Sequence, residues 1–119
     1  MAISRFSLVA LDCPDPAALA EFYIAIAGGS VLRVDDDWVR VAMPEGVDLA
    51  FQLAPDHRPP EWPDGVPQQA HLDFDVDDLD AAVEAALAVG GRLADAQPSP
   101  DHWRVMFDPA GHPFCFVLV

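Results

Sequence analysis

Two stretches of the chain carry the same pattern and decide the fold. The first, Leu8–Gly29, reads LVALDCPDPAALAEFYIAIAGG, and the second, His71–Gly91, reads HLDFDVDDLDAAVEAALAVGG. When the first stretch is shifted by 63 residues, Asp12 falls on Asp75, and a pair of glycines closes each stretch. An ordered set of matches of this kind is the signature of an internal duplication.

The matches continue beyond these stretches at a displacement of 65 residues. Trp38 falls on Trp103 and Gly46 on Gly111, and the pairs Pro44/Pro109 and Phe51/Phe116 follow the same shift. The small change in displacement is what insertions in turns produce. We therefore expect each half of the chain to fold with the same order of elements.

The first half predicts one strand, one helix and three further strands. Residues 3–11 are apolar and rich in strand-forming types. Asp15 before a proline is typical of a helix start, apolar residues then recur at helical spacing, and the Gly28–Gly29 pair ends the pattern. Short strands are expected over residues 31–34, 38–43 and 48–53.

The second half repeats this order. A strand is expected over 70–76, a helix over 79–89 with a buried stripe of Leu79, Val83, Ala86 and Leu87, and strands over 92–96, 102–107 and 114–119. Five of the twelve prolines lie in the connector between the halves, residues 55–69. We expect an α+β fold: one domain of two βαβββ modules, residues 1–54 and 70–119, with a mostly antiparallel curved sheet.

Composition bounds the class of protein. The 119 residues are 52% hydrophobic, and twenty acidic residues against six arginines give a formal charge of −14. This charge disfavours nucleic acids and anionic membranes as partners, because both are bound by basic surfaces. No apolar run is long enough for a membrane span, the first residues do not resemble a signal peptide, and two cysteines make no disulfide scaffold. The cytoplasm is the expected compartment.

Three motifs together resemble the vicinal oxygen chelate superfamily. They are LDCPDP at 11–16 followed by Phe22–Tyr23, AHLDFDVDDLDAAV at 70–83 and FDPAGHPFCFV at 107–117. This superfamily includes glyoxalase I, extradiol dioxygenases, fosfomycin-resistance enzymes and bleomycin-binding proteins, and the chain looks most like its small glyoxalase-like branch. The resemblance implies sheets curled around a ligand cup, and it implies a homodimer.

In the metal-dependent relatives, a divalent ion is held by residues of the first and last strands of both modules. The matching positions here are Leu8, Ala50 or Gln52, His71 and Cys115. Leucine cannot ligate a metal, and the remaining set differs from the histidine and carboxylate shell of those relatives. The resemblance therefore implies a protein without the standard metal quartet; His71 and Gln52 are the ligands if a divalent metal binds after all.

The other candidate residues are polar or aromatic. His71, Asp73 and Asp75 alternate with apolar residues, so we expect them on one face of a strand, where Asp73 orients His71 as an acid/base pair or both contact a ligand. Trp38 and Trp103 are expected to line the cup or the core. Trp62, in the connector, is expected to act as a lid or an interface residue.

Three functions remain open on this basis. The first is a small-molecule-binding protein of the bleomycin-resistance type, which holds a cationic or planar metabolite or drug in an acidic, aromatic cup. Its ligand-binding residues are expected to be His71, Asp73, Gln52, Trp38, Trp62, Trp103, Cys115 and Leu8. The second is a metal-dependent lyase, isomerase or dioxygenase in which His71 is catalytic. The third is an interaction module without a ligand.

Overall fold

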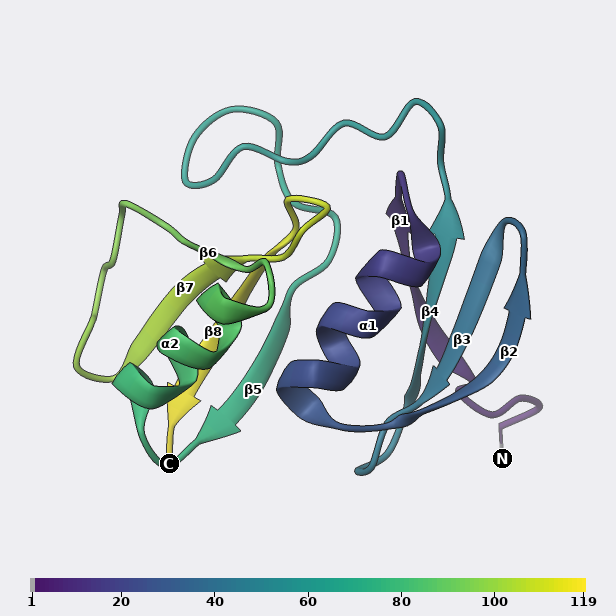
Figure 1. The fold of residues 1–119 in the computed structure, drawn as a ribbon, viewed down its shortest axis with the longest axis horizontal. Helices are drawn as coiled ribbons and strands as arrows, with labels where there is room; N and C mark the ends of the chain where they lie inside the picture. Colours follow the sequence, from purple (N-terminus) through teal and green to yellow (C-terminus); the bar gives the residue numbers. More distant parts are fainter. Residues whose placement is uncertain (1) are drawn as a thin grey trace. The chain divides into compact units, whose positions relative to one another are not determined.

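The two halves of the repeat fold as two units of the same topology (Figure 1). The computed structural model describes residues 2–119. The chain divides into Met1–His57 and Arg58–Val119, so most of the proline-rich connector belongs to the second unit. Each unit builds its own four-stranded mixed sheet, with one parallel and two antiparallel strand pairs. The predicted α+β class and repeated βαβββ order are confirmed.

The first unit is a sheet with the strand order β1-β4-β3-β2, covered on one face by α1 (Figure 1). Its elements are β1 (Leu8–Cys13), α1 (Pro16–Ala27), β2 (Ser30–Asp35), β3 (Trp38–Ala42) and β4 (Asp48–Leu53).

Two neighbouring residues fix the start of α1. The Asp15 carboxylate accepts a hydrogen bond from the Ala18 N–H, and Pro16 occupies the first turn, as predicted.

The Tyr23 ring of α1 stacks on Phe51 of β4, with ring centroids 5.6 Å apart. Phe51 therefore faces the helix, and its neighbours Ala50 and Gln52 face the other side of the sheet.

The second unit repeats this arrangement with the strand order β5-β8-β7-β6. Its elements are β5 (Leu72–Val76), α2 (Leu79–Ala88), β6 (Arg92–Leu93), β7 (Trp103–Phe107) and β8 (Pro113–Leu118). Asp78 caps α2 by accepting from the Ala81 N–H.

An aromatic row and an ion pair mark the helix-covered face of the second sheet. Phe74 and Phe116 are register partners, Phe116 is paired in turn with Arg104, and the Arg104 guanidinium lies 3.0 Å from the Asp80 carboxylate on α2. Because side chains alternate along a strand, the next residues, Asp73, Asp75, Cys115 and Val117, lie on the helix-free face.

Two predictions based on apolar residues are wrong, because these residues have no partner to pack against. The strand expected from residue 3 begins only at Leu8, the first residue paired with β4, and Ile3 and Phe6 before it are exposed. Leu87, expected in the buried stripe of the second helix, is also exposed, whereas Leu79, Val83 and Ala86 are buried.

A side chain explains why β6 has only two residues. The Gln97 amide accepts from the Val105 N–H and donates to the Val105 carbonyl, so it occupies the place of a strand neighbour beside β7. The same amide also donates to the Ala94 carbonyl. The strand predicted over 92–96 is thus cut short by a side chain that satisfies the backbone of β7.

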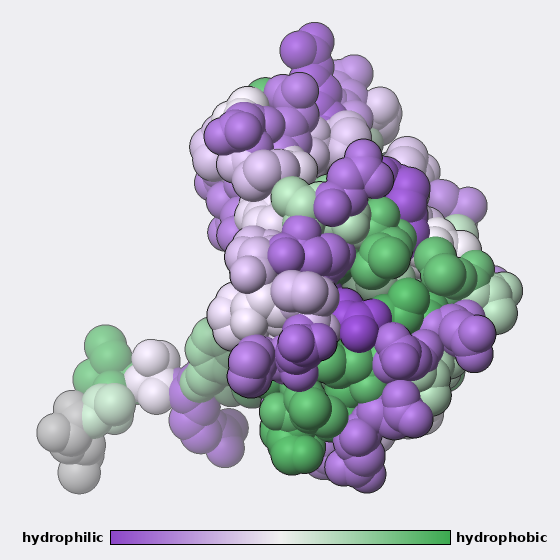
Figure 2. All heavy atoms as spheres, turned by 90° about the vertical axis from the view of Figure 1, so that its left-hand side faces the viewer, coloured by the Kyte–Doolittle hydropathy of each residue, from purple (hydrophilic) through white to green (hydrophobic). Residues whose placement is uncertain are grey.

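Polar and apolar side chains are interspersed over the face of the molecule that Figure 2 presents, where green apolar areas are separated by purple hydrophilic ones. Leu87, Val89 and Leu93 are among the exposed apolar residues of the second unit. Among the described residues, neither helix has the length and apolar character that crossing a bilayer requires.

Candidate functional site

The helix-free face of the second sheet carries the polar candidates in two parallel rows. Strand register places Asp73 beside Cys115 and Cys115 beside Val105; one step along, Asp75 is beside Val117 and Val117 beside Trp103. Residues in register on neighbouring strands point to the same side of a sheet. This unit therefore brings an acidic strand, a thiol and a tryptophan onto one surface.

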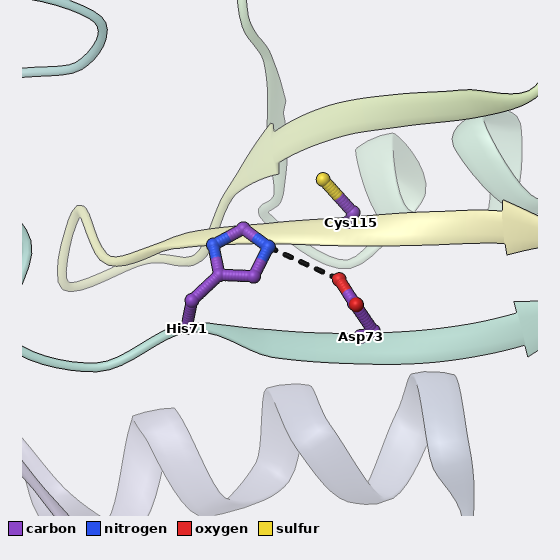
Figure 3. A group of neighbouring side chains, drawn as sticks. All are labelled: His71, Asp73 and Cys115. Carbon is purple, nitrogen blue, oxygen red and sulfur yellow. Dashed lines mark hydrogen bonds and ion pairs between the residues drawn. The ribbon is translucent and has the colours of Figure 1, made fainter.

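His71, Asp73 and Cys115 form a compact group on this surface (Figure 3). One nitrogen, oxygen or sulfur atom from each side chain lies within 4.8 Å of the other two. His71 comes directly before β5, Asp73 lies on β5 and Cys115 on β8. The His71 and Asp73 side chains are 31% and 61% exposed, whereas Cys115 is 7% exposed, so the thiol forms the floor of the group.

Both ring nitrogens of His71 lie against acceptor oxygens. Nε2 is 3.1 Å from Asp73 Oδ1, and Nδ1 is 3.0 Å from Gln68 Oε1. A neutral imidazole carries one N–H and can donate to only one of these oxygens, whereas an imidazolium donates to both. Asp73 and Gln68 therefore fix the orientation of the His71 ring from both of its nitrogens.

The Cys115 thiol holds its proton at neutral pH. Burial raises the pKa of Cys115 from 9.0 to about 11, and the Asp73 carboxylate adds to the rise. A thiolate is the nucleophilic form of cysteine, so this environment disfavours nucleophilic use of Cys115. The thiol is suited to packing, or to losing its proton when a metal ion takes the proton's place.

The first unit repeats the aspartate–tryptophan row without the histidine. Asp12 is beside Gln52 and Gln52 beside Trp38 in the strand register, in the same order as Asp75, Val117 and Trp103. Gln52 is exposed, Trp38 is half-buried and Trp103 is 38% exposed. Each unit therefore places a carboxylate and an indole on its helix-free face, with one strand between them.

The remaining candidate ligand-binding residues are divided between the two units. Leu8 and Ala50 lie in the first unit, and strand alternation places them on the same face as Gln52. His71, Asp73, Cys115, Trp62 and Trp103 lie in the second unit. Trp62 is half-buried and packs against the buried cluster of Ala94, Val105, Phe107 and Cys115, so it covers part of the second sheet.

The superfamily's metal positions do not fit its usual ion, because Leu8 carries no ligand atom and its counterpart on β4 is Ala50, which carries none, or Gln52, which offers only an amide. The group within the second unit is a different donor set of imidazole, carboxylate and thiol. In a tetrahedral zinc shell, donors with bond lengths of about 2.0–2.3 Å lie roughly 3.3–3.8 Å apart. The three donor atoms here lie within 4.8 Å of one another, so the side chains would close slightly around an ion. Gln68 also provides the hydrogen bond at Nδ1 that orients a metal-ligating histidine. His71, Asp73 and Cys115 are therefore compatible with a thiophilic divalent ion.

The sequence alone missed Gln68 and the grouping of Asp73 with Cys115. Gln68 lies in the connector, where no periodic pattern indicates its direction. Asp73 and Cys115 are 42 positions apart, and their contact depends on the β5–β8 register. The repeat implies that β5 and β8 pair as β1 and β4 do, and both pairs are parallel in the structure.

Comparisons with known proteins agree with this topology. A family model for the glyoxalase-like domain matches residues 8–117. A search of curated proteins finds no match. Among solved structures, a glyoxalase/bleomycin resistance protein/dioxygenase family enzyme from Burkholderia phytofirmans PsJN has a TM-score of 0.74 at 21% identity, and the match covers 98% of this chain and 99% of that one.

Two further solved structures belong to proteins with named functions. The fosfomycin resistance protein FosX from Listeria monocytogenes has a TM-score of 0.74 at 15% identity, covering 99% of this chain and 95% of that one. The bleomycin-binding protein from Streptomyces verticillus, complexed with copper(II)-bleomycin, has a TM-score of 0.61 at 18% identity, covering 100% and 99%. At these identities the likeness concerns the fold, and the family model matches nearly the whole length. This chain therefore belongs to the glyoxalase-like domain family of the vicinal oxygen chelate superfamily.

Proposed function

We propose that this protein binds a flat, cationic small molecule on the helix-free faces of its sheets. The observation that carries the proposal is the row of Asp75, Val117 and Trp103. Neighbouring strands are about 4.8 Å apart, so a carboxylate and an indole two strands apart leave roughly 10 Å for a ring system between them. An aromatic face and a carboxylate both attract a cation.

Charge favours a cation over a neutral molecule. Asp73 and Asp75 are exposed on this face, and the whole chain carries −14. The bleomycin-binding relative supports the ligand class, because its ligand is a drug complex held by the same fold. Leu8 supports binding without the standard metal, because it occupies a ligand position with an aliphatic side chain.

Fluorescence titration with proflavine, a planar aromatic cation, tests this proposal against acridone, a neutral tricycle of similar shape. We expect proflavine to bind more tightly, and added salt to weaken it because salt screens the carboxylates. Asp75→Asn and Trp103→Ala are each expected to weaken binding by roughly 2–5-fold, the effect of an exposed cation–π or ion-pair contact.

Asp36→Asn is the matched control, because it removes the same charge from an exposed turn in the first unit. It is expected to leave proflavine binding within error of the wild type. Equal affinity for proflavine and acridone would overturn the cationic ligand. An Asp36→Asn effect as large as that of Asp75→Asn would show attraction by net charge alone.

A second candidate function is a metal-dependent lyase or isomerase, favoured by the group of three donor atoms in the second unit. We propose that His71 Nε2, an Asp73 oxygen and Cys115 Sγ would hold the ion. A bound divalent ion supplies Lewis acidity that polarises a substrate oxygen. Gln68 would keep the His71 ring oriented, and Asp73 would neutralise part of the ion's charge.

Cobalt(II) titration tests this second candidate, because a cobalt–thiolate bond has its own charge-transfer absorption. We expect the band in the wild type and in Cys13→Ser, and its loss in Cys115→Ser and His71→Ala. Absence of the band in the wild type, or its persistence in Cys115→Ser, would exclude this donor set.

We also propose that the protein is a homodimer, as the resemblance implied, and that it resides in the cytoplasm. Its cysteines, Cys13 and Cys115, are both buried thiols, as suits a reducing compartment. Size-exclusion chromatography with light scattering is expected to give the mass of two chains, and the mass of one chain would contradict it.

A further inference from the structure

A cavity of about 360 Å³ lies between the connector and the edge of the second sheet. Its lining includes Glu61 and Trp62 from the connector, Arg92 and Asp95 from β6 and the segment after it, and Phe107 from β7. None of its lining residues belongs to the His71, Asp73 and Cys115 group. The volume is at the lower end of the range of about 300–1,000 Å³ that small-molecule sites occupy.

The connector wall of this cavity is anchored rather than loose. Trp62 packs against the buried cluster that contains Val105 and Phe107. The Glu61 N–H donates to the Val66 carbonyl at 2.7 Å, and the Val66 N–H donates to Glu61 Oε1 at 3.2 Å. This reciprocal pair ties the loop closed and holds the Glu61 carboxylate in place.

The opposite wall presents a stacked guanidinium. The Arg92 Cζ atom lies 4.4 Å from the centroid of the Phe107 ring, a cation–π contact. The arginines that form ion pairs within residues 2–119 are Arg33, Arg40 and Arg104, and Arg92 is not among them. Its planar fork of N–H donors remains available for a bidentate contact with a carboxylate.

The lining of the cavity carries charges of both signs. A lone anion at Arg92 would lie beside the carboxylates of Glu61 and Asp95, and a lone cation at those carboxylates would lie beside Arg92. A molecule that carries both charges satisfies both sides at once. The partly buried Trp62 side chain offers the remaining surface to an apolar group.

We propose that this cavity binds a zwitterion with an apolar body, specifically an α-amino acid with an aromatic side chain. Its carboxylate pairs with Arg92, its ammonium group with Glu61 and Asp95, and its ring contacts Trp62. The cavity shares Trp62 with the ligand-binding residues expected from the sequence, but none of its lining residues belongs to the row of Asp75, Val117 and Trp103 that carries the proposed function.

Isothermal titration of the full chain with L-phenylalanine tests the site. The matched ligands are N-acetyl-L-phenylalanine, which lacks the positive charge, and phenethylamine, which lacks the negative one. We expect L-phenylalanine to bind at least tenfold more tightly than either. Arg92→Gln is expected to weaken L-phenylalanine at least tenfold, and Arg92→Lys by less, because lysine keeps the charge without the fork.

Arg5→Gln is the control variant, since it removes the same charge outside the cavity, and it is expected to bind L-phenylalanine as the wild type does. Thermal melts establish that each variant is folded. Should Arg92→Gln unfold, the double variant Glu61→Gln/Asp95→Asn carries the test through the loss of preference over N-acetyl-L-phenylalanine. No binding of L-phenylalanine by the wild type, or equal affinity for all three ligands, would overturn the proposal.

Discussion

The fold changes the acidity of one thiol, Cys115. Its sulfur lies under Asp73 and His71 on the floor of the polar group, where burial and the neighbouring carboxylate both disfavour the thiolate. The unfolded chain has neither effect, so the folded state binds the Cys115 proton more tightly. The protonation of a single side chain is therefore linked to the stability of the second unit.

Stability is expected to fall between pH 9 and pH 11 because of Cys115. Below about 9 the thiol is protonated in both states; above it the unfolded chain ionises first, and the folded thiol follows at about 11. The loss is on the order of 2 kcal/mol. Urea unfolding of the wild type and Cys115→Ser across this range measures it, with Cys115→Ser expected to lose less. Parallel pH profiles for the two proteins would mean that the thiol is not perturbed.

At the residue scale, the sequence predicted contacts between side chains of one strand better than contacts with the connector. Alternation along one strand predicted that His71 and Asp73 lie side by side, and their side chains are within 3.1 Å. The contact with Gln68 depends on how an aperiodic connector turns, which local pattern does not encode. Likewise, the packing of Trp62 on the core depends on tertiary contacts of the proline-rich segment.

At the scale of elements, internal repetition made the prediction strong. Aspartate caps and glycine stops are local signals, so both helices begin at the predicted residues and end within one residue of prediction. Strand ends depend on partners: β1 begins where β4 can pair with it, and β6 ends where Gln97 replaces a strand. The errors fall where a pairing partner, rather than local propensity, decides.

Any side chain at Gly111, in the β7–β8 turn, is expected to destabilise the fold. Gly111 has φ +89°, and a Cβ there would overlap the Cβ of Pro59 in the connector. Gly46 is its repeat-related counterpart, with φ +108°; apart from its own chain neighbours, no atom of the described residues lies within 4 Å of the point where a Cβ would lie. Gly46→Ala therefore carries only the backbone penalty, about 1 kcal/mol, whereas Gly111→Ala adds displacement of Pro59 and is expected to cost about 3 kcal/mol.

Urea denaturation of the two glycine variants gives this comparison directly. Because both glycines have a similar positive φ, the difference in free energy of unfolding between the two variants measures the cost of displacing Pro59 from the turn. Equal losses of stability would mean that Pro59 moves aside freely.

At the scale of the whole molecule, the dominant feature is uncompensated negative charge. Twenty acidic residues face six arginines. The arginine ion pairs within residues 2–119 join Arg33 to Asp35, Arg40 to Asp48 and Arg104 to Asp80, and each includes an exposed or half-exposed partner. Such pairs contribute little stability individually. Repulsion among the remaining carboxylates therefore opposes the compact state.

Salt is expected to stabilise the protein, because it screens this repulsion more than it weakens the few ion pairs. Raising ionic strength from about 0.01 M to 0.1 M shortens the screening length from about 30 Å to about 10 Å, so we expect the melting temperature to rise over this range.

The variant Asp36→Asn, in an exposed turn, should increase the free energy of unfolding by up to about 0.5 kcal/mol at low salt, and by less at high salt. Arg5→Gln should act in the opposite sense. Differential scanning fluorimetry in sodium chloride measures all three. A melting temperature that falls with salt would mean that the ion pairs, rather than the excess of carboxylates, control the electrostatic stability.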